Sequence, residues 1–214
     1  MAGGDNKRFW GRYSRFYDFE VLRTSREAYG QVGRMISEAL KPDMDVLEVA
    51  TGTGLIALSI AGAAHSVTAT DFSDKMIATA KRKRAPANVT FAVEDATELT
   101  FPDASFDAAI ISNALHIMPH PTKALAEIRR VLRPGGLLFA PTFSHGHIGQ
   151  SRWNFNARLL KLIGFESHSK WTPEQFVAFV NANGFSVDRW QVLKAAFPLV
   201  YLEAHSRRNL GGTQ

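Results

Sequence analysis

Cysteine does not occur among the 214 residues of the chain. Without a thiol there can be no disulfide, no thiolate zinc site and no cysteine nucleophile. Long apolar runs are also missing, because no stretch reaches the roughly 18 apolar residues that a membrane-spanning helix needs. Residues 1–7 lack the apolar segment that a signal peptide carries. We therefore expect a cytoplasmic protein.

Charge of either sign is modest, although the net charge is +5 at neutral pH. A basic excess can indicate nucleic acid or an anionic membrane as a partner. Here the basic residues are scattered, and the densest run, residues 81–84 (KRKR), falls where a predicted helix ends. Such a run complements the helix dipole and is usually solvated. We expect no specific nucleic-acid partner, at most peripheral contact with a membrane, and a monomer or homodimer.

The apolar pattern changes at residue 44 into strands that alternate with helices. Strands are predicted at 46–50, 67–70, 89–93, 106–112 and 137–143, and helices at 54–63, 73–84 and 121–132. Strands that are apolar throughout, with helices between them, indicate a parallel sheet covered on both faces. The tail predicts a helix at 173–182 and strands at 185–193 and 197–205, whose short link permits only an antiparallel pair.

Together these elements predict an α/β, Rossmann-like, doubly wound sheet. We expect seven strands, mostly parallel, with one antiparallel strand near the C-terminus. Two helices are expected ahead of the sheet, at 7–20 and 25–40. We interpret residues 1–40 as an N-terminal helical lid or extension. Residues 41–214 then form the core, with an insertion at about 144–171.

The most informative local pattern is a buried strand that runs into a glycine-rich turn and a helix. Glycine tolerates positive φ and carries no Cβ, so Gly52 and Gly54 let the backbone approach a nucleotide-like ligand closely. Together with Ala57 they also fit the dinucleotide fingerprint G-x-G-x-x-G/A. This spacing alone leaves the identity of the nucleotide cofactor open.

Polar residues at the ends of the later strands narrow the choice of cofactor. Asp71 ends the second strand, where its carboxylate can accept hydrogen bonds from both hydroxyls of a ribose. Residues 94–96 end the third strand, where an acidic side chain can meet the adenine amine. A carboxylate at Asp71 disfavours NADP, whose 2′-phosphate is matched by arginine.

Four blocks carry a resemblance to a known family. They are residues 46–54 (VLEVATGTG), 70–76 (TDFSDKM), 94–107 (EDATELTFPDASFD) and 132–136 (LRPGG). In this order and spacing, the chain resembles the class I S-adenosylmethionine-dependent methyltransferases, in the small-molecule subgroup that includes the ubiquinone/menaquinone-biosynthesis C-methyltransferases. The resemblance covers roughly residues 40–143. One departure is Ala50-Thr51, where many members have Gly-Cys or Asp-Cys.

The resemblance implies a site for S-adenosylmethionine, with S-adenosylhomocysteine as the product. In it, Glu48 organises the glycine turn, Asp71 holds the ribose and Asn113 lies beside the methionine moiety. The other implied contacts are Ala50, Gly52 and Gly54 at the methionine end, Phe72 and Met76 flanking the adenine, and Asp95 and Ala96 at its edge.

Aromatic rings attract a sulfonium through their quadrupole. Tyr13 and Tyr17 could therefore close over the cofactor as a lid, and the Tyr17-Asp18 pair resembles the N-terminal pattern of the family. The alternative is that these aromatic residues only pack on the edge of the sheet.

His116 follows the fourth strand and is our candidate for a general base, because a neutral imidazole takes up a proton near pH 7. The alternative is a histidine that is hydrogen-bonded within its loop. Candidate contacts to the acceptor are His145, His147, Trp153, Arg158 and Trp171. The two histidines have a spacing seen in metal sites, but no third ligand accompanies them, so we expect no metal.

The leading hypothesis is methyl transfer from S-adenosylmethionine to a small, aromatic or lipid-like acceptor, on carbon, oxygen or nitrogen. A nucleic-acid methyltransferase is disfavoured because residues 112–115 (SNAL) replace the Asn/Asp-Pro-Pro-Tyr/Phe block of amino-directed enzymes. An NAD-binding oxidoreductase is supported only by the glycine spacing. A relative that binds the cofactor without turnover is a further alternative.

Overall fold

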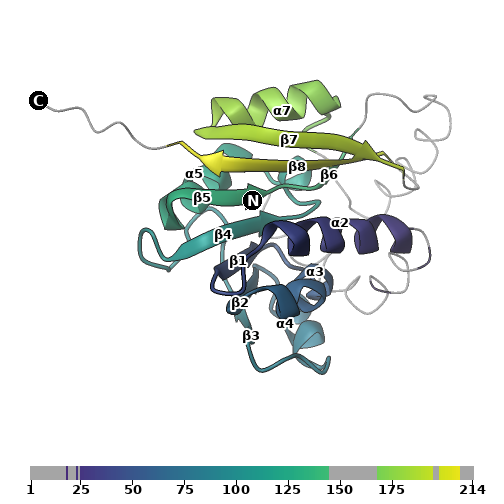
Figure 1. Cartoon of the computed structure of the whole chain (residues 1–214), viewed down its shortest axis with the longest axis vertical. Helices are drawn as coiled ribbons and strands as arrows, with labels where there is room; N and C mark the ends of the chain where they lie inside the picture. The colour runs from purple at the N-terminus through teal and green to yellow at the C-terminus, as the bar shows by residue number, and fades with distance from the viewer. Residues whose placement is uncertain (1–17, 19–22, 24, 145–167, 195–197, 208–214) are drawn as a thin grey trace, which may run out of the picture.

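The computed structural model describes Asp18, Arg23 and residues 25–144, 168–194 and 198–207 (Figure 1). Its strands are β1 (Asp45–Val49), β2 (Ser66–Asp71), β3 (Val89–Val93), β4 (Phe106–Ile111), β5 (Leu132–Phe139), β6 (Thr142–Phe143), β7 (Phe185–Leu193) and β8 (Leu199–Ser206). The α-helices are α2 (Arg26–Ala39), α3 (Leu55–Ile60), α4 (Asp74–Lys81), α5 (Pro121–Val131) and α7 (Pro173–Ala182). Two short 3-10 helices are η1 (Ala61–Ala63) and η2 (Leu115–Ile117).

All eight strands belong to one sheet, whose order is β3-β2-β1-β4-β5-β8-β6, with β7 paired to β8. Strands β1 to β5 run parallel to one another. Strand β8 is antiparallel to β5, β6 and β7. The chain moves outward from β1 to β3 and returns on the other side of β1 at β4. The carboxyl ends of β1 and β4 therefore flank a switch point of the topology, where open α/β sheets bind ligands.

This topology confirms the predicted α/β, doubly wound, mostly parallel sheet, but not the predicted number of strands. We expected seven strands, and the described residues hold eight. The run predicted as one strand, residues 137–143, is interrupted between Phe139 and Thr142, although both pieces pair with β8 in the same register. At the break, Pro141 has no N–H to donate, and its carbonyl accepts a hydrogen bond from the Asn113 N–H at 2.8 Å.

Several helix ends also differ from the prediction, and two of them are informative. Helix α4 ends at Lys81, three residues earlier than expected from the sequence pattern. Helix α5 ends at Val131, and the Pro134–Gly136 turn lies inside β5 instead of ahead of it. The turn is accommodated as an irregularity in the pairing of β4 with β5.

The core lies on both faces of the sheet. Val46 and Leu47 are consecutive in β1 and fully buried, yet they belong to separate apolar clusters. One cluster includes Ile56 of α3, and the other includes Ile128 of α5 and Phe176 of α7. A central strand buried on both faces explains why β1 is apolar after Asp45, apart from Glu48.

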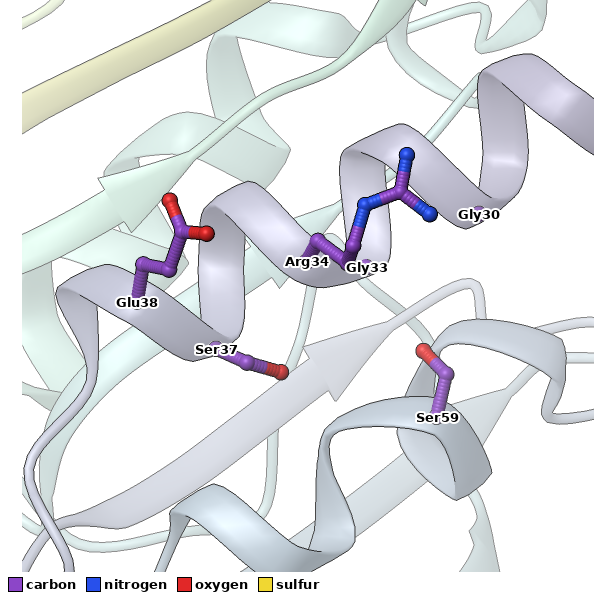
Figure 2. A pocket seen from close by; sticks show the side chains of 6 residues that line it. All are labelled: Gly30, Gly33, Arg34, Ser37, Glu38 and Ser59. Atoms are coloured by element: carbon purple, nitrogen blue, oxygen red, sulfur yellow. The ribbon is translucent and has the colours of Figure 1, made fainter.

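Helix α2 packs against α3, and the two helices lie side by side (Figure 1). Gly33 makes this approach possible, since a Cβ there would lie 2.7 Å from the Ser59 hydroxyl oxygen. Beside this contact is an open groove of about 320 Å³ (Figure 2), lined by Gly30, Gly33, Arg34, Ser37, Glu38 and Ser59. Val32 and Ile36 of α2 are buried with the core residues of α3 and α4. The division of the chain at residue 40 stays a prediction.

Replacing Gly54 by alanine should lower the free energy of unfolding by at least about 2 kcal/mol. Gly54 has a φ of 80°, and a Cβ there would lie 2.7 Å and 2.9 Å from two ring carbons of Phe91. Gly62→Ala is the matched control, because a Cβ at Gly62 meets no atom within 4 Å. Urea denaturation measures both variants, and equal midpoints would contradict the close approach at Gly54.

Candidate functional site

The turn that follows β1 has an unusual backbone. Ala50, Gly52 and Gly54 have φ values of 55°, 58° and 80°. For Ala50 the left-handed region costs about 1 kcal/mol, because its Cβ crowds the backbone. This is the position at which the chain has alanine where many members of the resembled family have glycine or aspartate. Sparsely populated backbone conformations of this kind gather at ligand sites. Backbone bonds hold the turn, from the Thr51 N–H to the Thr70 carbonyl at 2.8 Å and from the Gly54 N–H to the Thr51 carbonyl at 3.0 Å.

Glu48 is buried in β1, directly beneath this turn. One of its carboxylate oxygens, Oε2, accepts hydrogen bonds from the Thr51 hydroxyl at 2.6 Å and from the Ala57 N–H at 2.8 Å. A single carboxylate thus joins the turn to the first turn of α3. Burial raises the pKa of Glu48 to about 7, and the hydrogen bonds from Thr51 and Ala57 limit that increase.

Asp71 ends β2 and contacts both the glycine turn and the start of α4. Its Oδ2 accepts a hydrogen bond from the Gly52 N–H at 2.9 Å, and its Oδ1 accepts one from the Ser73 N–H at 2.9 Å. Burial raises the pKa of Asp71 to about 6, against the lowering effect of the hydrogen bonds from Ser73 and Gly52. An ionised carboxylate has about four acceptor positions, so each oxygen keeps capacity for a further donor.

The residues predicted around the adenine lie next to Asp71 in the fold. Phe72 is half-buried, and Met76 is buried in the first turn of α4. At the end of β3, the exposed Asp95 accepts hydrogen bonds from the N–H and the hydroxyl of Thr97, at 2.8 Å and 2.7 Å. Ala96 beside it is buried. The ends of β2 and β3 are joined directly, because the Glu94 N–H donates to the Asp71 carbonyl at 3.2 Å.

Asn113 connects three elements at the end of β4. It has a φ of 52°, in the left-handed region that asparagine tolerates better than most residues. Its Nδ2 donates to the Tyr29 hydroxyl of α2 at 2.9 Å, and its Oδ1 accepts from the Phe143 N–H of β6 at 3.1 Å. Tyr29 was not among the site residues predicted from the sequence. No sequence signal could have found this contact, which joins residues 84 positions apart.

His116 lies in η2, with an exposed fraction of 6%. Its Nδ1 and the Thr142 hydroxyl are 3.0 Å apart. The His116 carbonyl accepts hydrogen bonds from the N–H groups of His168 and Ser169, at 2.9 Å and 3.0 Å. These contacts tie the end of β4 to β6 and to the segment ahead of α7. The role of His116 as a general base stays a prediction.

Most of the other predicted contacts lie outside the described residues, namely Tyr13, Tyr17, His145, His147, Trp153 and Arg158. Trp171 is described, and its ring stacks on Phe179 of α7 with centroids 4.5 Å apart. Among the residues that the structure describes, there is no cluster of three or more histidine or acidic side chains that could hold a metal ion. In the same residues, no helix is long and apolar enough to cross a membrane.

Lys83 departs from the prediction that the run 81–84 is solvated. Its ammonium group donates to the Thr53 carbonyl at 2.7 Å and lies 2.7 Å from a carboxylate oxygen of Asp18. The other three residues of the run are exposed. The charge pattern of a helix end gave no reason to separate Lys83 from its neighbours.

Comparison with known proteins agrees with this geometry. Residues 47–140 match the family model of a methyltransferase domain. A demethylmenaquinone methyltransferase from Renibacterium salmoninarum is 39% identical over 137 residues, which cover 64% of this chain and 57% of that protein. The ubiquinone/menaquinone biosynthesis C-methyltransferase UbiE from Brucella anthropi is 33% identical over 174 residues, which cover 70% of this chain and 66% of that protein. The chain thus spans little more than half the length of the first relative.

Among solved structures, the (4+2)-cyclase SpnF has the same fold, with a TM-score of 0.69 and 22% identity over 83% of this chain and 80% of that one. At this identity the likeness establishes the fold and not the reaction. The names of the matched domain and of the two relatives agree with the four sequence blocks. Residues 47–140 form a methyltransferase domain, as the resemblance to the class I S-adenosylmethionine-dependent methyltransferases predicts.

Proposed function

We propose that this chain transfers the methyl group of S-adenosylmethionine to carbon in a small quinone-like ring. The observation that carries the proposal is the carboxylate of Asp71, held by the N–H groups of Gly52 and Ser73 at the switch point of the sheet. The names of the two relatives support a quinone precursor as the first acceptor to test. O- and N-methylation of an aromatic or lipid-like molecule are the alternatives within the same reaction class.

The residues around the turn fit the cofactor. Gly52 and Gly54 carry no Cβ, so the backbone can lie close to the ligand, while Asp71 keeps acceptor positions for the two ribose hydroxyls. Phe72 and Met76 offer apolar contacts for a purine ring. Glu48 keeps the turn joined to α3. A dinucleotide would use the same turn, so cofactor choice is itself part of the test.

When bound, the cofactor supplies an activated methyl carbon, which the acceptor attacks in line as the carbon–sulfur bond breaks and its electron pair goes to sulfur. The chain then has to align the two molecules and exclude water. The acceptor must also lose one proton. We propose His116 as the group that receives it, because it lies in η2, three residues after Asn113 at the end of β4.

Several further expectations belong to the same proposal. Tyr13 and Tyr17 are proposed to cover the cofactor, and His145, His147, Trp153, Arg158 and Trp171 to contact the acceptor. We also propose an N-terminal lid or extension at residues 1–40, a core at 41–214 and a cytoplasmic location. The protein would act as a monomer or homodimer, with at most peripheral membrane contact.

A second candidate function is a different reaction on a similar cofactor site. The observation that favours it is the fold shared with a protein named as a cyclase. In that case the cofactor would bind and no methyl group would leave it. Detection of both methylated acceptor and S-adenosylhomocysteine separates the two functions.

We expect saturable binding of S-adenosylmethionine and S-adenosylhomocysteine in calorimetry, and no saturable binding of NAD. With labelled S-adenosylmethionine and a reduced demethylated quinone, mass spectrometry should detect the label on a ring carbon of the acceptor. Binding of NAD alone would overturn the proposal. Binding of S-adenosylmethionine without methyl transfer to any acceptor in a panel of quinols, phenols and amines would favour the second function.

Asp71→Asn should weaken binding of S-adenosylhomocysteine by about 10- to 100-fold, the effect of losing a hydrogen bond to a charged group. The amide nitrogen cannot accept a hydrogen bond, so one of the Gly52 and Ser73 N–H groups also loses its acceptor. Asp74→Asn is the matched control, because Asp74 is exposed in the first turn of α4. Unchanged affinity in calorimetry for the Asp71 variant would place the ribose elsewhere.

The affinity for S-adenosylhomocysteine should rise with pH through the pKa of Asp71, which burial raises to about 6. Only the ionised carboxylate accepts hydrogen bonds on all of its positions, so the ligand favours the deprotonated form and lowers the pKa in the complex. As the pH falls below 6, the dissociation constant should increase by up to about tenfold per pH unit. Above about pH 7 it should be constant. Calorimetry from pH 5 to 8 measures this profile. Asp71→Asn should remove the slope, and a slope that persists in this variant would assign the titration to another group such as Glu48.

A further inference from the structure

A buried threonine in the middle of the glycine turn is held by two charged residues from distant parts of the chain. Thr53 has an exposed fraction of 0% and lies between Gly52 and Gly54, both with positive φ. Its hydroxyl donates to Asp18 Oδ1. Its carbonyl accepts from the Lys83 ammonium group at 2.7 Å. The hydroxyl and the carbonyl of Thr53 are thus both bound from outside the turn.

The two charged residues also bind each other. The Lys83 ammonium nitrogen lies 2.7 Å from Asp18 Oδ2, and the side chains of Lys83 and Asp18 are 23% and 28% exposed. The three residues form a closed cluster, because each of them contacts the other two. Because this ion pair is partly buried, water and salt screen it less than they would screen an exposed pair. Lys83 also acts on the carboxylate beneath the turn, since its charge lowers the pKa of Glu48.

The turn needs such support because its glycines supply none. Two glycines that flank one residue allow the backbone many conformations. Fixing the turn in one conformation therefore costs more conformational entropy than it would without the glycines. Glu48 holds Thr51 and Asp71 holds Gly52 at the start of the turn. The Asp18–Lys83 pair holds Thr53, farther along the same turn. A turn that is already in its bound shape binds a ligand more tightly.

We infer that Lys83 and Asp18 are positioning residues for the cofactor, which hold Thr53 and thereby keep the glycine turn in its binding conformation. Neither residue needs to touch the ligand. The inference rests on the proposed binding of S-adenosylmethionine at this turn. It assigns a function to one lysine within a basic run whose other members are exposed.

Calorimetry with S-adenosylhomocysteine tests the inference on four forms of the full chain: wild type, Lys83→Met, Lys83→Arg and Lys81→Met. Lys83→Met should weaken binding by about tenfold, as expected for losing a charged hydrogen bond. Lys83→Arg keeps a donor and a charge and should recover most of the affinity. Lys81→Met removes the same charge from the exposed end of α4, and its affinity should equal that of the wild type.

A double-substitution cycle separates positioning from loss of fold or of general charge. Asp18→Asn and Lys83→Met should each weaken binding, and the double variant should be little weaker than Lys83→Met alone, because the cluster is already broken. Thermal unfolding curves of each variant without ligand identify a temperature at which all variants are folded, and binding is measured at that temperature. Equal affinities of the wild type and Lys83→Met at that temperature would overturn the inference, as would full additivity in the cycle. A wild-type protein that does not bind S-adenosylhomocysteine would instead overturn the proposed function.

Discussion

Two carboxylates buried under the glycine turn are the constraint on which the site depends. Glu48 and Asp71 together accept four hydrogen bonds, three of them from the turn and from the first turn of α3. Hydrogen bonds to a charged group contribute about 1.5–3 kcal/mol each, whereas burial of the charge costs several kcal/mol. The raised pKa values of about 7 and about 6 indicate that burial outweighs the hydrogen bonds in both cases. Further donors, such as ribose hydroxyls at Asp71, would therefore stabilise the ionised form that the free protein holds at a cost.

The fold could be predicted from the sequence because its main determinants are local. β1 is a mostly apolar run next to a glycine turn, and the strand of residues 89–93 was predicted with the bounds it has in the structure. The eighth strand was missed although the sequence held a local signal for it, since Pro141 within the run 137–143 has no N–H for the strand ladder. The Pro134–Gly136 turn was misplaced for a different reason, because its position inside β5 depends on pairing with β4.

The same distinction applies to the candidate site. Glu48 and Asp71 lie in two of the four sequence blocks. Their places in and at the end of strands could therefore be predicted from the residues next to them in the sequence. The partners that complete the site are remote in the chain: Tyr29 is 84 positions from Asn113, and Thr53 is 35 and 30 positions from Asp18 and Lys83. Tyr29 and Lys83 have ordinary roles in a helix and in a charge run, and the sequence did not link Asp18 to Thr53. Only the fold brings them together.

The two parts of the proposed site come from different stretches of the chain. The proposed cofactor residues lie at the ends of parallel strands, which apolar clusters bury on both faces. The proposed acceptor contacts fall in residues 144–171, which lie between β6 and α7 in the sequence and mostly outside the described residues. Connections vary more readily than strand ends and carry specificity in many folds. A scaffold of this kind can keep one cofactor site while the segments that bind the acceptor change.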